Sequence, residues 1–338
     1  MIKKIPPFFN INKYTNEDVL RIYEKRQEVM GMRQKPRRLK KGDTIGIISP
    51  SGPFQEEKMA RALPFLEQLG LNYKLGKNAR NRFGYLAGKD EERVADLHEM
   101  FADSRIAGII CARGGYGAAR FTDKIDFACI RKHPKVFWGY SDITFLHTAI
   151  GQLANLVTFH GPMLSSDIAG DDFDALSASM FEQLFEPTTL TYDESISELE
   201  VLSEGKVKAQ LIGGNLSLLT KSIGTKFEIE TSGKILFIED IGEEPYRVDG
   251  MLNQLRQAHK LDRLAGVVIG DFAQAQSTGS KSSFTLDEVF EDYFKSATYP
   301  VVKGFKIGHC QPHFAIPLGV EAQLDATNKV LRLAPGVE

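Results

Sequence analysis

The chain has 338 residues, enough for two domains of ordinary size. Charged residues make up 25% and hydrophobic residues 42%, as in soluble globular proteins, and the net charge of −2 points to neither nucleic acid nor an anionic membrane as partner. No apolar run approaches the roughly 20 residues that span a bilayer, and the N-terminus lacks the apolar core of a signal peptide, so we expect a cytoplasmic protein.

The N-terminal half alternates strands and helices. Residues 1–40 are predicted to form an extension with one helix over 16–30, and residues 41–186 a first domain. Its strands are apolar throughout, which is typical of a parallel sheet covered on both faces. The expected strands are 44–49, 71–76, 107–115, 135–141 and 156–162, and the expected helices are 56–70, 89–104 and one that follows Ser141.

The pattern changes near residue 186. Residues 187–205 are rich in Thr, Ser and Glu and are predicted to be a linker with short strands. Residues 206–338 are predicted to form a second domain that mixes strands and helices. Its expected strands are 234–240, 266–272, 301–309 and 322–334, and its expected helices are 246–261 and 283–297.

Ser141 lies between a strand and a helix, in "WGYSDIT", and has two interpretations. Serine is a preferred helix N-cap, so Ser141 is accounted for as a cap alone. A strand–turn–helix also projects a serine hydroxyl in the nucleophile elbow, although the G-x-S-x-G pattern is incomplete, because Gly139 is present at −2 but Ile143 occupies +2. Both interpretations stay open on these residues.

The loop after the third strand contains three glycines in five residues, Arg113 to Gly117. Glycines let the backbone approach a ligand closely, and N–H groups there are candidates for an oxyanion hole together with the N–H of Asp142. Arg113 is a candidate partner for a substrate carboxylate. A tight turn with a solvated arginine explains the loop equally well, and no Walker or complete dinucleotide-binding motif is present.

A serine nucleophile needs a base, and the base needs an orienting acid. His160 and His309 are the two histidines predicted at strand ends, and His309 has the better setting because Gly304 and Gly308 flank its strand. Glu239 ends an apolar strand, where it is either a helix cap or a functional acid.

Other chemistries are less well supported. The three cysteines, an odd number without C-x-x-C, indicate neither a disulfide framework nor a zinc knuckle. Cys310 adjoins His309, but adjacent strand residues face opposite ways. His309 and His313 have the i, i+4 spacing of a helical zinc site, yet Pro312 lies between them and H-E-x-x-H is absent. A metal-dependent amidohydrolase is therefore only an alternative.

Taken together, these motifs resemble the LD-carboxypeptidase family, which includes muramoyl-tetrapeptide carboxypeptidases and microcin C self-immunity peptidases. The resemblance runs from about Lys40 to Gly336 and depends on the order and spacing of many short motifs. They are "IGIISPSGP", "GIICARGGYGAAR", "FWGYSDITFLHTAI", "HGPM", "LIGGNLSLL", "ILFIEDIGEEPYRVDGMLNQL", "GVVIGDF" and "GFKIGHCQPHFAIPLG".

The resemblance implies an α/β fold with a Rossmann-like parallel-sheet N-terminal domain and a smaller barrel-like C-terminal domain. It implies a serine peptidase without metal or cofactor, with Ser141, Glu239 and His309 as the triad in a groove between the domains, often in a homodimer. The implied substrate is the L,D-amide to the terminal D-alanine of murein tetrapeptides. Backbone N–H groups of Asp142 and Gly115 would form the oxyanion hole, and Arg113 and Gly114 would bind substrate. Hydrolysis of acyl-nucleotide amides is the alternative within the family.

Overall fold

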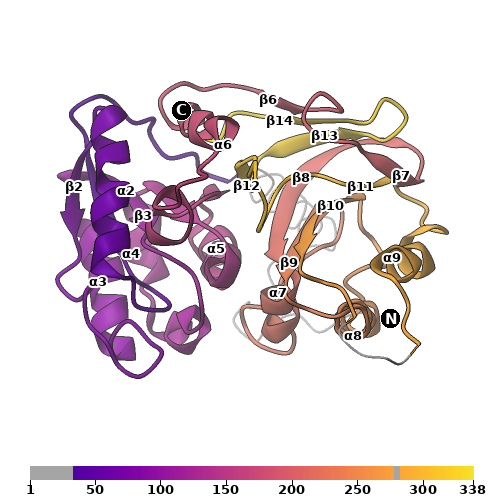
Figure 1. Cartoon of the computed structure of the whole chain (residues 1–338), viewed down its shortest axis with the longest axis horizontal. Helices are drawn as coiled ribbons and strands as arrows, with labels where there is room; N and C mark the ends of the chain where they lie inside the picture. The colour runs from indigo at the N-terminus through magenta and orange to yellow at the C-terminus, as the bar shows by residue number, and fades with distance from the viewer. Residues whose placement is uncertain (1–32, 278–281) are drawn as a thin grey trace, which may run out of the picture. The chain divides into compact units, whose positions relative to one another are not determined.

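The computed structural model describes residues 33–277 and 282–338, so the helix expected over 16–30 lies outside the described residues. Two β-sheets with helices packed against them organise this part of the chain (Figure 1). The first sheet comes mostly from the N-terminal half and the second from the C-terminal half. Within the described ranges, no helix combines the length and the apolar character needed to cross a membrane.

The first sheet has six strands, of which the five from the N-terminal half are parallel. These strands are largely buried because helices cover the sheet on both faces, except for the edge strand Asn72–Leu75, which is partly exposed. The sixth strand comes from the far end of the chain and pairs antiparallel with its neighbour. The strands are β1(Thr44–Ile48), β2(Asn72–Leu75), β3(Ile106–Cys111), β4(Val136–Gly139), β5(Thr158–His160) and β12(Ile316–Leu318).

The spatial order of this sheet is β12-β5-β4-β3-β1-β2. The parallel part therefore has the order 2-1-3-4-5, which is the flavodoxin-type doubly wound order and differs from the 3-2-1-4-5-6 order of the Rossmann fold. The expected parallel α/β sheet is present, whereas the description as Rossmann-like is not confirmed. In this order the sequence of strands reverses at β1, because β2 lies on one side of β1 and β3 on the other. In open α/β sheets, ligands bind outside the carboxyl ends of the strands at such a point.

The longer helices over this sheet bury one face each, whereas the short helix Thr144–Ala149 is buried throughout. In α2, Met59, Ala62 and Leu66 recur at helical spacing and are buried against the sheet. The longer helices are α2(Glu56–Gln68) and α3(Asp90–Ala102), and the shorter ones are α4(Phe127–Lys132), α5(Thr144–Ala149) and α6(Ala175–Ser179). Single turns and irregular helical segments are η2(Ala118–Arg120), η3(Thr122–Lys124), η4(Ser141–Ile143), η5(Ile150–Ala154), η6(Leu164–Ile168) and η7(Met180–Leu184).

The second sheet has eight strands in the order β6-β14-β13-β8-β9-β10-β11-β7 and curls into a half-barrel (Figure 1). Its centre, β8 to β11, is parallel, and the outer pairs are antiparallel. The strands are β6(Leu190–Tyr192), β7(Glu200–Ser203), β8(Lys206–Asn215), β9(Ile235–Ile241), β10(Gly266–Ala273), β11(Val301–Lys303), β13(Glu321–Asp325) and β14(Val330–Leu333). The helices α7(Leu216–Ser222), α8(Pro245–Gln257) and α9(Leu286–Phe294) pack on it.

The two halves exchange structure. The segment 187–205, predicted as a linker with short strands, supplies β6 and β7, the two edges of the second sheet. In return, β12 extends the first sheet by pairing with β5. The division into domains at 41–186, 187–205 and 206–338 stays a prediction.

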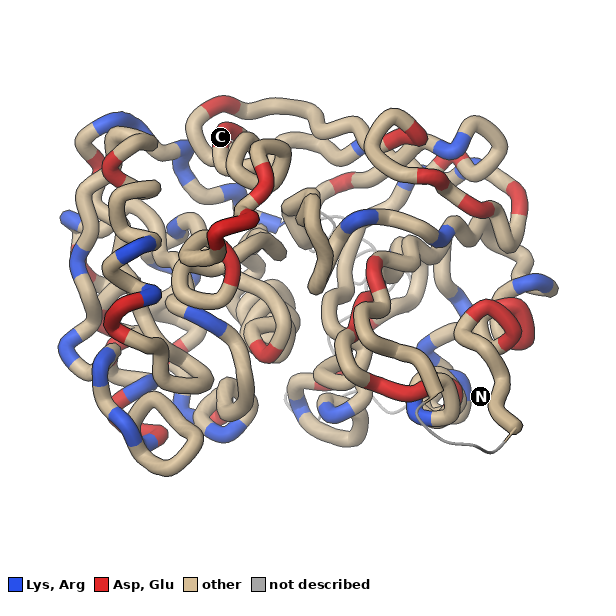
Figure 2. Tube along the Cα trace, in the orientation of Figure 1, with Lys and Arg blue, Asp and Glu red and all other residues tan. Residues whose placement is uncertain are grey.

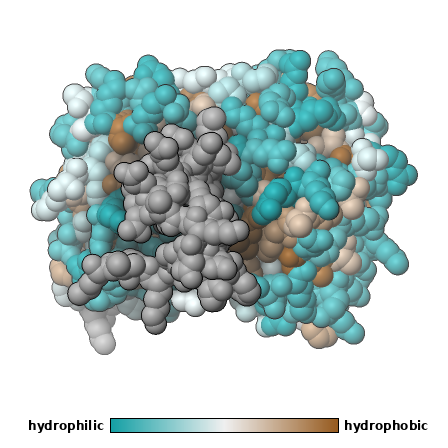
Figure 3. Space-filling view, turned by 180° about the vertical axis from the view of Figure 1, so that it is seen from behind, coloured by the Kyte–Doolittle hydropathy of each residue, from teal (hydrophilic) through white to brown (hydrophobic). Residues whose placement is uncertain are grey.

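Charges of both signs are interspersed along the described part of the chain (Figure 2). In Figure 3 the surface coloured by hydropathy is largely hydrophilic, and the hydrophobic residues form small separate areas. In these two views the described residues show neither a large area of one charge nor a large hydrophobic area.

Candidate active site

Ser141 lies at a strained turn between β4 and α5. Tyr140 is extended, with φ −153°, and Ser141 then takes φ 63°, in the left-handed region that a non-glycine residue seldom adopts. Such strain is concentrated at functional sites, and a sharp strand-to-helix turn is the geometry of a nucleophile elbow. The hydroxyl of Ser141 is bonded to His309, so its recorded partner is a side chain and not the helix backbone that a cap would engage.

Two glycines allow the elbow to pack closely. A Cβ added to Gly114 would lie 3.0 Å from the Cβ and 3.2 Å from the Oγ of Ser141, and one added to Gly139 would lie 3.1 Å from the Cβ of Cys111. Both contacts are tighter than ordinary side-chain packing, so the small residues bring the loop after β3 against the serine. Gly139 thus has the role of the −2 glycine of an elbow, while the +2 position, Ile143, is buried in the core.

The side chain of Asp142 ties neighbouring loops to the elbow. Its Oδ2 accepts a hydrogen bond of 2.6 Å from the hydroxyl of Ser51 and one of 2.9 Å from the N–H of Ala118. The carboxyl is buried, and burial raises its pKa against the effect of these donors. The sequence predicted a role only for the backbone N–H of Asp142, and the "SPSGP" motif gave no sign that the side chains of Ser51 and Asp142 pair.

His309 and Glu239 reach Ser141 from the second half of the chain. The Nε2 atom of His309 lies 3.2 Å from the Oγ of Ser141, and its Nδ1 atom lies 2.7 Å from the Oε2 of Glu239. With the proton on Nδ1, the imidazole donates to the carboxylate, and Nε2 accepts from the serine hydroxyl. The structure therefore brings the three predicted side chains into one hydrogen-bonded chain.

Burial and charge set the protonation of these hydrogen-bonded side chains. Burial alone would lower the pKa of His309, but the Glu239 carboxylate outweighs it and holds that pKa above its ordinary value. Glu239 is fully buried, which raises its own pKa against the opposing effect of His309. A histidine that acts as general base becomes an imidazolium during the reaction, and a buried carboxylate beside it stabilises that form.

The prediction that His309 ends a strand was wrong. β11 ends at Lys303, and His309 lies six residues later in a loop without regular structure. Gly304, with φ 100°, directly follows the last residue of β11 and turns the backbone there, and Gly308, with φ 127°, turns it again just before His309. A Cβ added to Gly308 would lie 2.7 Å from the Oε2 of Glu239, so this glycine lets the loop close on the acid.

Direct bonds hold the two halves together beside the site. The Oγ1 of Thr144, at the start of α5, accepts from the N–H of Asn215 at the end of β8, at 2.9 Å. The amide of Asn215 in turn donates to Asp240, the neighbour of Glu239, at 2.9 Å. These contacts fix the serine and its two partners relative to each other, although they come from different sheets.

Tyr140 packs against the imidazole of His309, with ring centroids 4.8 Å apart. Its hydroxyl donates to Asp167 at 2.7 Å, which fixes the ring. Tyr140 and Asp167 were not predicted from the sequence, because contact between the residue after β4 and the segment Leu164–Ile168 depends on the fold.

The remaining histidines near the site are held neutral by burial. Burial lowers the pKa of His313 to about 3 and that of His160 well below its ordinary value. His160 ends β5 as predicted, but it faces Tyr140, at 5.5 Å between ring centroids. Among the described residues, no group of three or more His, Cys, Asp and Glu side chains is placed to hold a metal ion.

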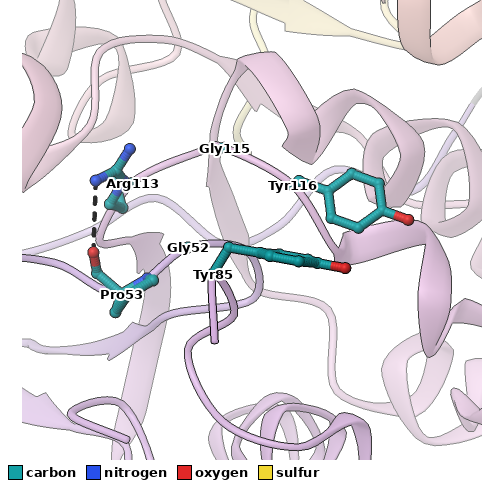
Figure 4. Close-up of a pocket in the computed structure, with 6 residues that line it drawn as sticks. All are labelled: Gly52, Pro53, Tyr85, Arg113, Gly115 and Tyr116. Carbon is teal, nitrogen blue, oxygen red and sulfur yellow. Dashed lines mark hydrogen bonds between the residues drawn. The ribbon is translucent and has the colours of Figure 1, made fainter. Parts of the chain in front are cut away.

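A cavity of about 610 Å³ is lined by the loops after β1 and β3, the two strands between which the sheet order reverses (Figure 4). Arg113 lies on one side, where its Nη1 donates to the carbonyl of Pro53 at 3.4 Å and its Nε to that of Gly114 at 3.2 Å. The rings of Tyr85 and Tyr116 pack edge to face on the other side, with centroids 5.6 Å apart. Gly115 completes the wall, so Arg113 and the glycine loop do line a space large enough for a ligand.

Comparison with known proteins identifies the family of the chain. The chain matches the sequence profile of the LD-carboxypeptidase N-terminal domain over residues 45–161 and that of the LD-carboxypeptidase C-terminal domain over residues 208–324. It is 52% identical over 309 residues to a probable murein peptide carboxypeptidase of Bacillus subtilis, covering 91% of this chain and 97% of the relative. The chain belongs to the LD-carboxypeptidase family. It is a serine-type carboxypeptidase, a peptide hydrolase.

Solved structures of this family have the same fold. A muramoyltetrapeptide carboxypeptidase from Oxalobacter formigenes is similar with a TM-score of 0.77 and 30% identity, over 86% of this chain and 97% of that one. The microcin C7 self-immunity protein MccF, in complex with glutamyl sulfamoyl guanosine, gives a TM-score of 0.81 at 27% identity, over 89% and 98% of the two chains. Both branches of the LD-carboxypeptidase family are thus represented among the neighbours.

Proposed function

We propose that this LD-carboxypeptidase hydrolyses the L,D-amide bond to the terminal D-alanine of murein tetrapeptides with Ser141, His309 and Glu239 as its catalytic triad. The observation that carries the proposal is the hydrogen-bonded chain from Ser141 Oγ to His309 Nε2, at 3.2 Å, and from His309 Nδ1 to Glu239, at 2.7 Å. Serine, base and orienting acid in this order make a weak alcohol nucleophilic.

In this mechanism His309 removes the proton of the Ser141 hydroxyl as the oxygen attacks the scissile carbonyl. The negative charge that develops on the carbonyl oxygen is bound by the backbone N–H groups of Asp142 and Gly115. His309 then gives its proton to the departing amine of D-alanine, leaving an acyl-enzyme at Ser141. A water molecule, deprotonated by His309, releases the peptide and restores the serine. Glu239 stabilises the imidazolium in both halves of the cycle.

The terminal carboxylate of the substrate would be bound by Arg113. Hydrogen bonds to the carbonyls of Pro53 and Gly114 anchor its guanidinium at the wall of the cavity beside Ser141, with further N–H donors left for an anion. Gly114 would allow the substrate backbone to approach, because even a single methyl group at this position would press on Ser141. A clamp on the terminal carboxylate explains a carboxypeptidase rather than an internal cleavage.

The similarity to MccF supports an alternative, the hydrolysis of acyl-nucleotide amides. In that branch of the family aromatic residues of a loop stack on the base. Trp138, the sole tryptophan of the sequence, is fully buried in β4 and its Nε1 donates to the carbonyl of Pro162 at 2.7 Å. Trp138 therefore has no free face for a base, and the aromatic rings exposed at the cavity are those of Tyr85 and Tyr116.

The family resemblance also supports a homodimer, a cytoplasmic location and a role in cell-wall recycling. We include these three features in the proposal, with no cofactor required by the triad chemistry.

The test is mass spectrometry of a murein tetrapeptide incubated with the protein, with an L,L-linked tetrapeptide and an aminoacyl sulfamoyl nucleoside as comparison substrates. We expect the tripeptide and free D-alanine from the L,D-peptide alone. Cleavage of the nucleoside with the L,D-peptide intact would replace the proposal with its alternative, and activity lost on adding a chelator would contradict a triad without metal.

A further inference from the structure

Tyr140 links the nucleophile of the proposed triad to its base. It immediately precedes Ser141 in the chain, and its ring packs on the imidazole of His309 with centroids 4.8 Å apart. The backbone of Tyr140 thus belongs to the first half of the chain, while its ring contacts a residue of the second half. Tyr140 is buried and is not among the residues that line the cavity beside Arg113, so contact with a ligand there does not explain it.

The imidazole of His309 needs support beyond its own loop. That loop has no regular structure, and the hydrogen bonds recorded for the ring within the described residues go to Glu239 and Ser141. Both bonds meet the ring at its nitrogens, so they leave the imidazole free to rock about the line that joins them. A second ring packed against it restricts this motion. Displacement of a reacting group by about 1 Å lowers rates by roughly 100-fold, so the restriction matters for the reaction.

Asp167 anchors the hydroxyl end of Tyr140. Its Oδ1 accepts from the Tyr140 hydroxyl at 2.7 Å, and its Oδ2 accepts from the N–H of Met163 at 2.8 Å and from the hydroxyl of Ser166 at 2.6 Å. Bonds within its own segment therefore fix the carboxylate that receives the tyrosine. Burial and the neighbouring Asp167 raise the pKa of Tyr140 well above its ordinary value, so the phenol keeps the proton that it donates.

Two buried histidines also pack on the ring of Tyr140. The ring centroids lie 4.8 Å apart for His313 and 5.5 Å apart for His160. None of the four ring nitrogens of these histidines has a hydrogen-bond partner among the described residues, and burial lowers the pKa of both. They contact Tyr140 as neutral rings. Aromatic packing on its sides and one hydrogen bond at its tip thus hold the tyrosine in a single orientation.

We propose that Tyr140 is a positioning residue: anchored by Asp167, its ring holds the imidazole of His309 in line with the hydroxyl of Ser141. Because Tyr140 and Ser141 are neighbours in the chain, the base is aligned to the nucleophile itself and not only to the acid of its own half. Tyr140 acts through His309 and contacts no reacting atom. This inference rests on the serine–histidine pair of the proposed function and does not depend on which peptide is cleaved.

The test measures kcat and KM on the L,D-tetrapeptide and the rate at which a fluorophosphonate labels Ser141, whose oxygen attacks phosphorus and displaces fluoride. Tyr140→Leu removes the ring and should lower kcat and the labelling rate each by roughly 100-fold. KM should stay within about two-fold, because the substrate cavity is intact. Tyr140→Phe removes only the hydroxyl bonded to Asp167 and should lower both rates by roughly 10-fold. Tyr73→Leu, on the edge strand β2, is the control and should retain both rates.

The pH profile separates this role from a merely structural one. Burial lowers the pKa of His309, and the carboxylates that act on its imidazole are those of Glu239, Asp167, Asp240 and Asp271. Because Asp167 raises the pKa of His309, Asp167→Asn should move the acid limb of kcat/KM to lower pH as well as lower kcat. Asp171→Asn, whose carboxylate is 97% exposed, is the control and should leave the limb in place. A weakened fold alone would not move it.

Folded Tyr140→Leu and Tyr140→Phe with the kcat and labelling rate of the wild type, or losses carried by KM instead, would overturn the positioning role. If Tyr140→Leu does not fold, Tyr140→Phe decides: wild-type rates in that variant would overturn the proposal. A wild-type protein that is not labelled at Ser141 would overturn the triad and this inference with it. Labelling of a wild-type protein that leaves the tetrapeptide intact would overturn the proposed substrate alone, and the labelling rates would then decide the role of Tyr140.

Discussion

The two halves of the molecule hold their catalytic candidates in different ways. Ser141 lies on a rigid turn between a buried strand and a helix, with its backbone strained at φ 63°. His309 lies in an irregular loop, whose shape depends on two glycines with positive φ and on the buried Glu239. The first half holds the hydroxyl of Ser141 through a strand and a helix. The second half holds the imidazole of His309 through a side-chain hydrogen bond to Glu239. We therefore expect substitutions in the first half to act by geometry and those in the second by charge.

The largest effect is expected at the serine itself. Ser141→Ala removes the nucleophile and should lower kcat by about 10,000-fold or more while the protein stays folded. D-Alanine release and circular dichroism together measure both outcomes. Ser195→Ala, on an exposed turn, is the control and should be fully active. Substantial turnover by folded Ser141→Ala would assign the chemistry elsewhere.

In the second half, Glu239→Gln should be next in size. The amide keeps the shape of the side chain but no longer offers a charge to the imidazolium, so kcat should fall about 100- to 10,000-fold. Steady-state kinetics with the L,D-tetrapeptide provide the measurement. A variant with undiminished kcat would remove Glu239 from the triad.

Gly114 tests whether the first half acts by geometry. Gly114→Ala places a methyl group 3.0 Å from the Cβ of Ser141, and a displacement of the serine by even 1 Å should lower kcat by roughly 100-fold. Gly250→Ala is the control, because an added Cβ there meets nothing within 4 Å and α8 gains up to about 1 kcal/mol of helix propensity. Equal kcat for the two variants would show that the elbow tolerates the methyl group.

Asp142 links stability to activity. Asp142→Asn replaces an acceptor of two hydrogen bonds by an amide that also carries donors, which should destabilise the fold by about 1–3 kcal/mol. We expect a lower Tm and a decrease in kcat of roughly ten-fold, because the loops beside Ser141 lose their common anchor. A variant with the Tm and kcat of the wild type would mean that these two bonds are dispensable.

The pH profile reports the charge effect in the second half. The base must be neutral to accept the serine proton, so activity falls as pH drops through the pKa of His309. Because Glu239 raises that pKa above the ordinary 6.5, the acid limb of kcat/KM should lie above pH 6.5. In Glu239→Gln the residual activity should show this limb at lower pH. A limb below 6.5 in the wild type would contradict the pairing.

The difference between the halves also explains what the sequence could predict. Ser141 follows an apolar strand, and Glu239 lies near the end of another. Because an apolar strand is recognised from neighbouring residues alone, both positions could be predicted from the sequence. The role of His309 was predicted, but the strand expected to reach His309 was wrong. β11 ends at Lys303, because Gly304 turns the backbone with a positive φ. Tyr140 with Asp167 and Ser51 with Asp142 were not predicted, since each pair joins segments that only the fold brings together.

Whether the two halves act as one catalytic unit is most directly tested by a kinetic cycle on the L,D-tetrapeptide with Ser141→Ala, His309→Ala and the double variant. If alcohol and imidazole cooperate in a single step, all three should retain nearly the same small residual rate. Losses that multiply in the double variant would show that the two residues act independently, and the account of a shared site would be wrong.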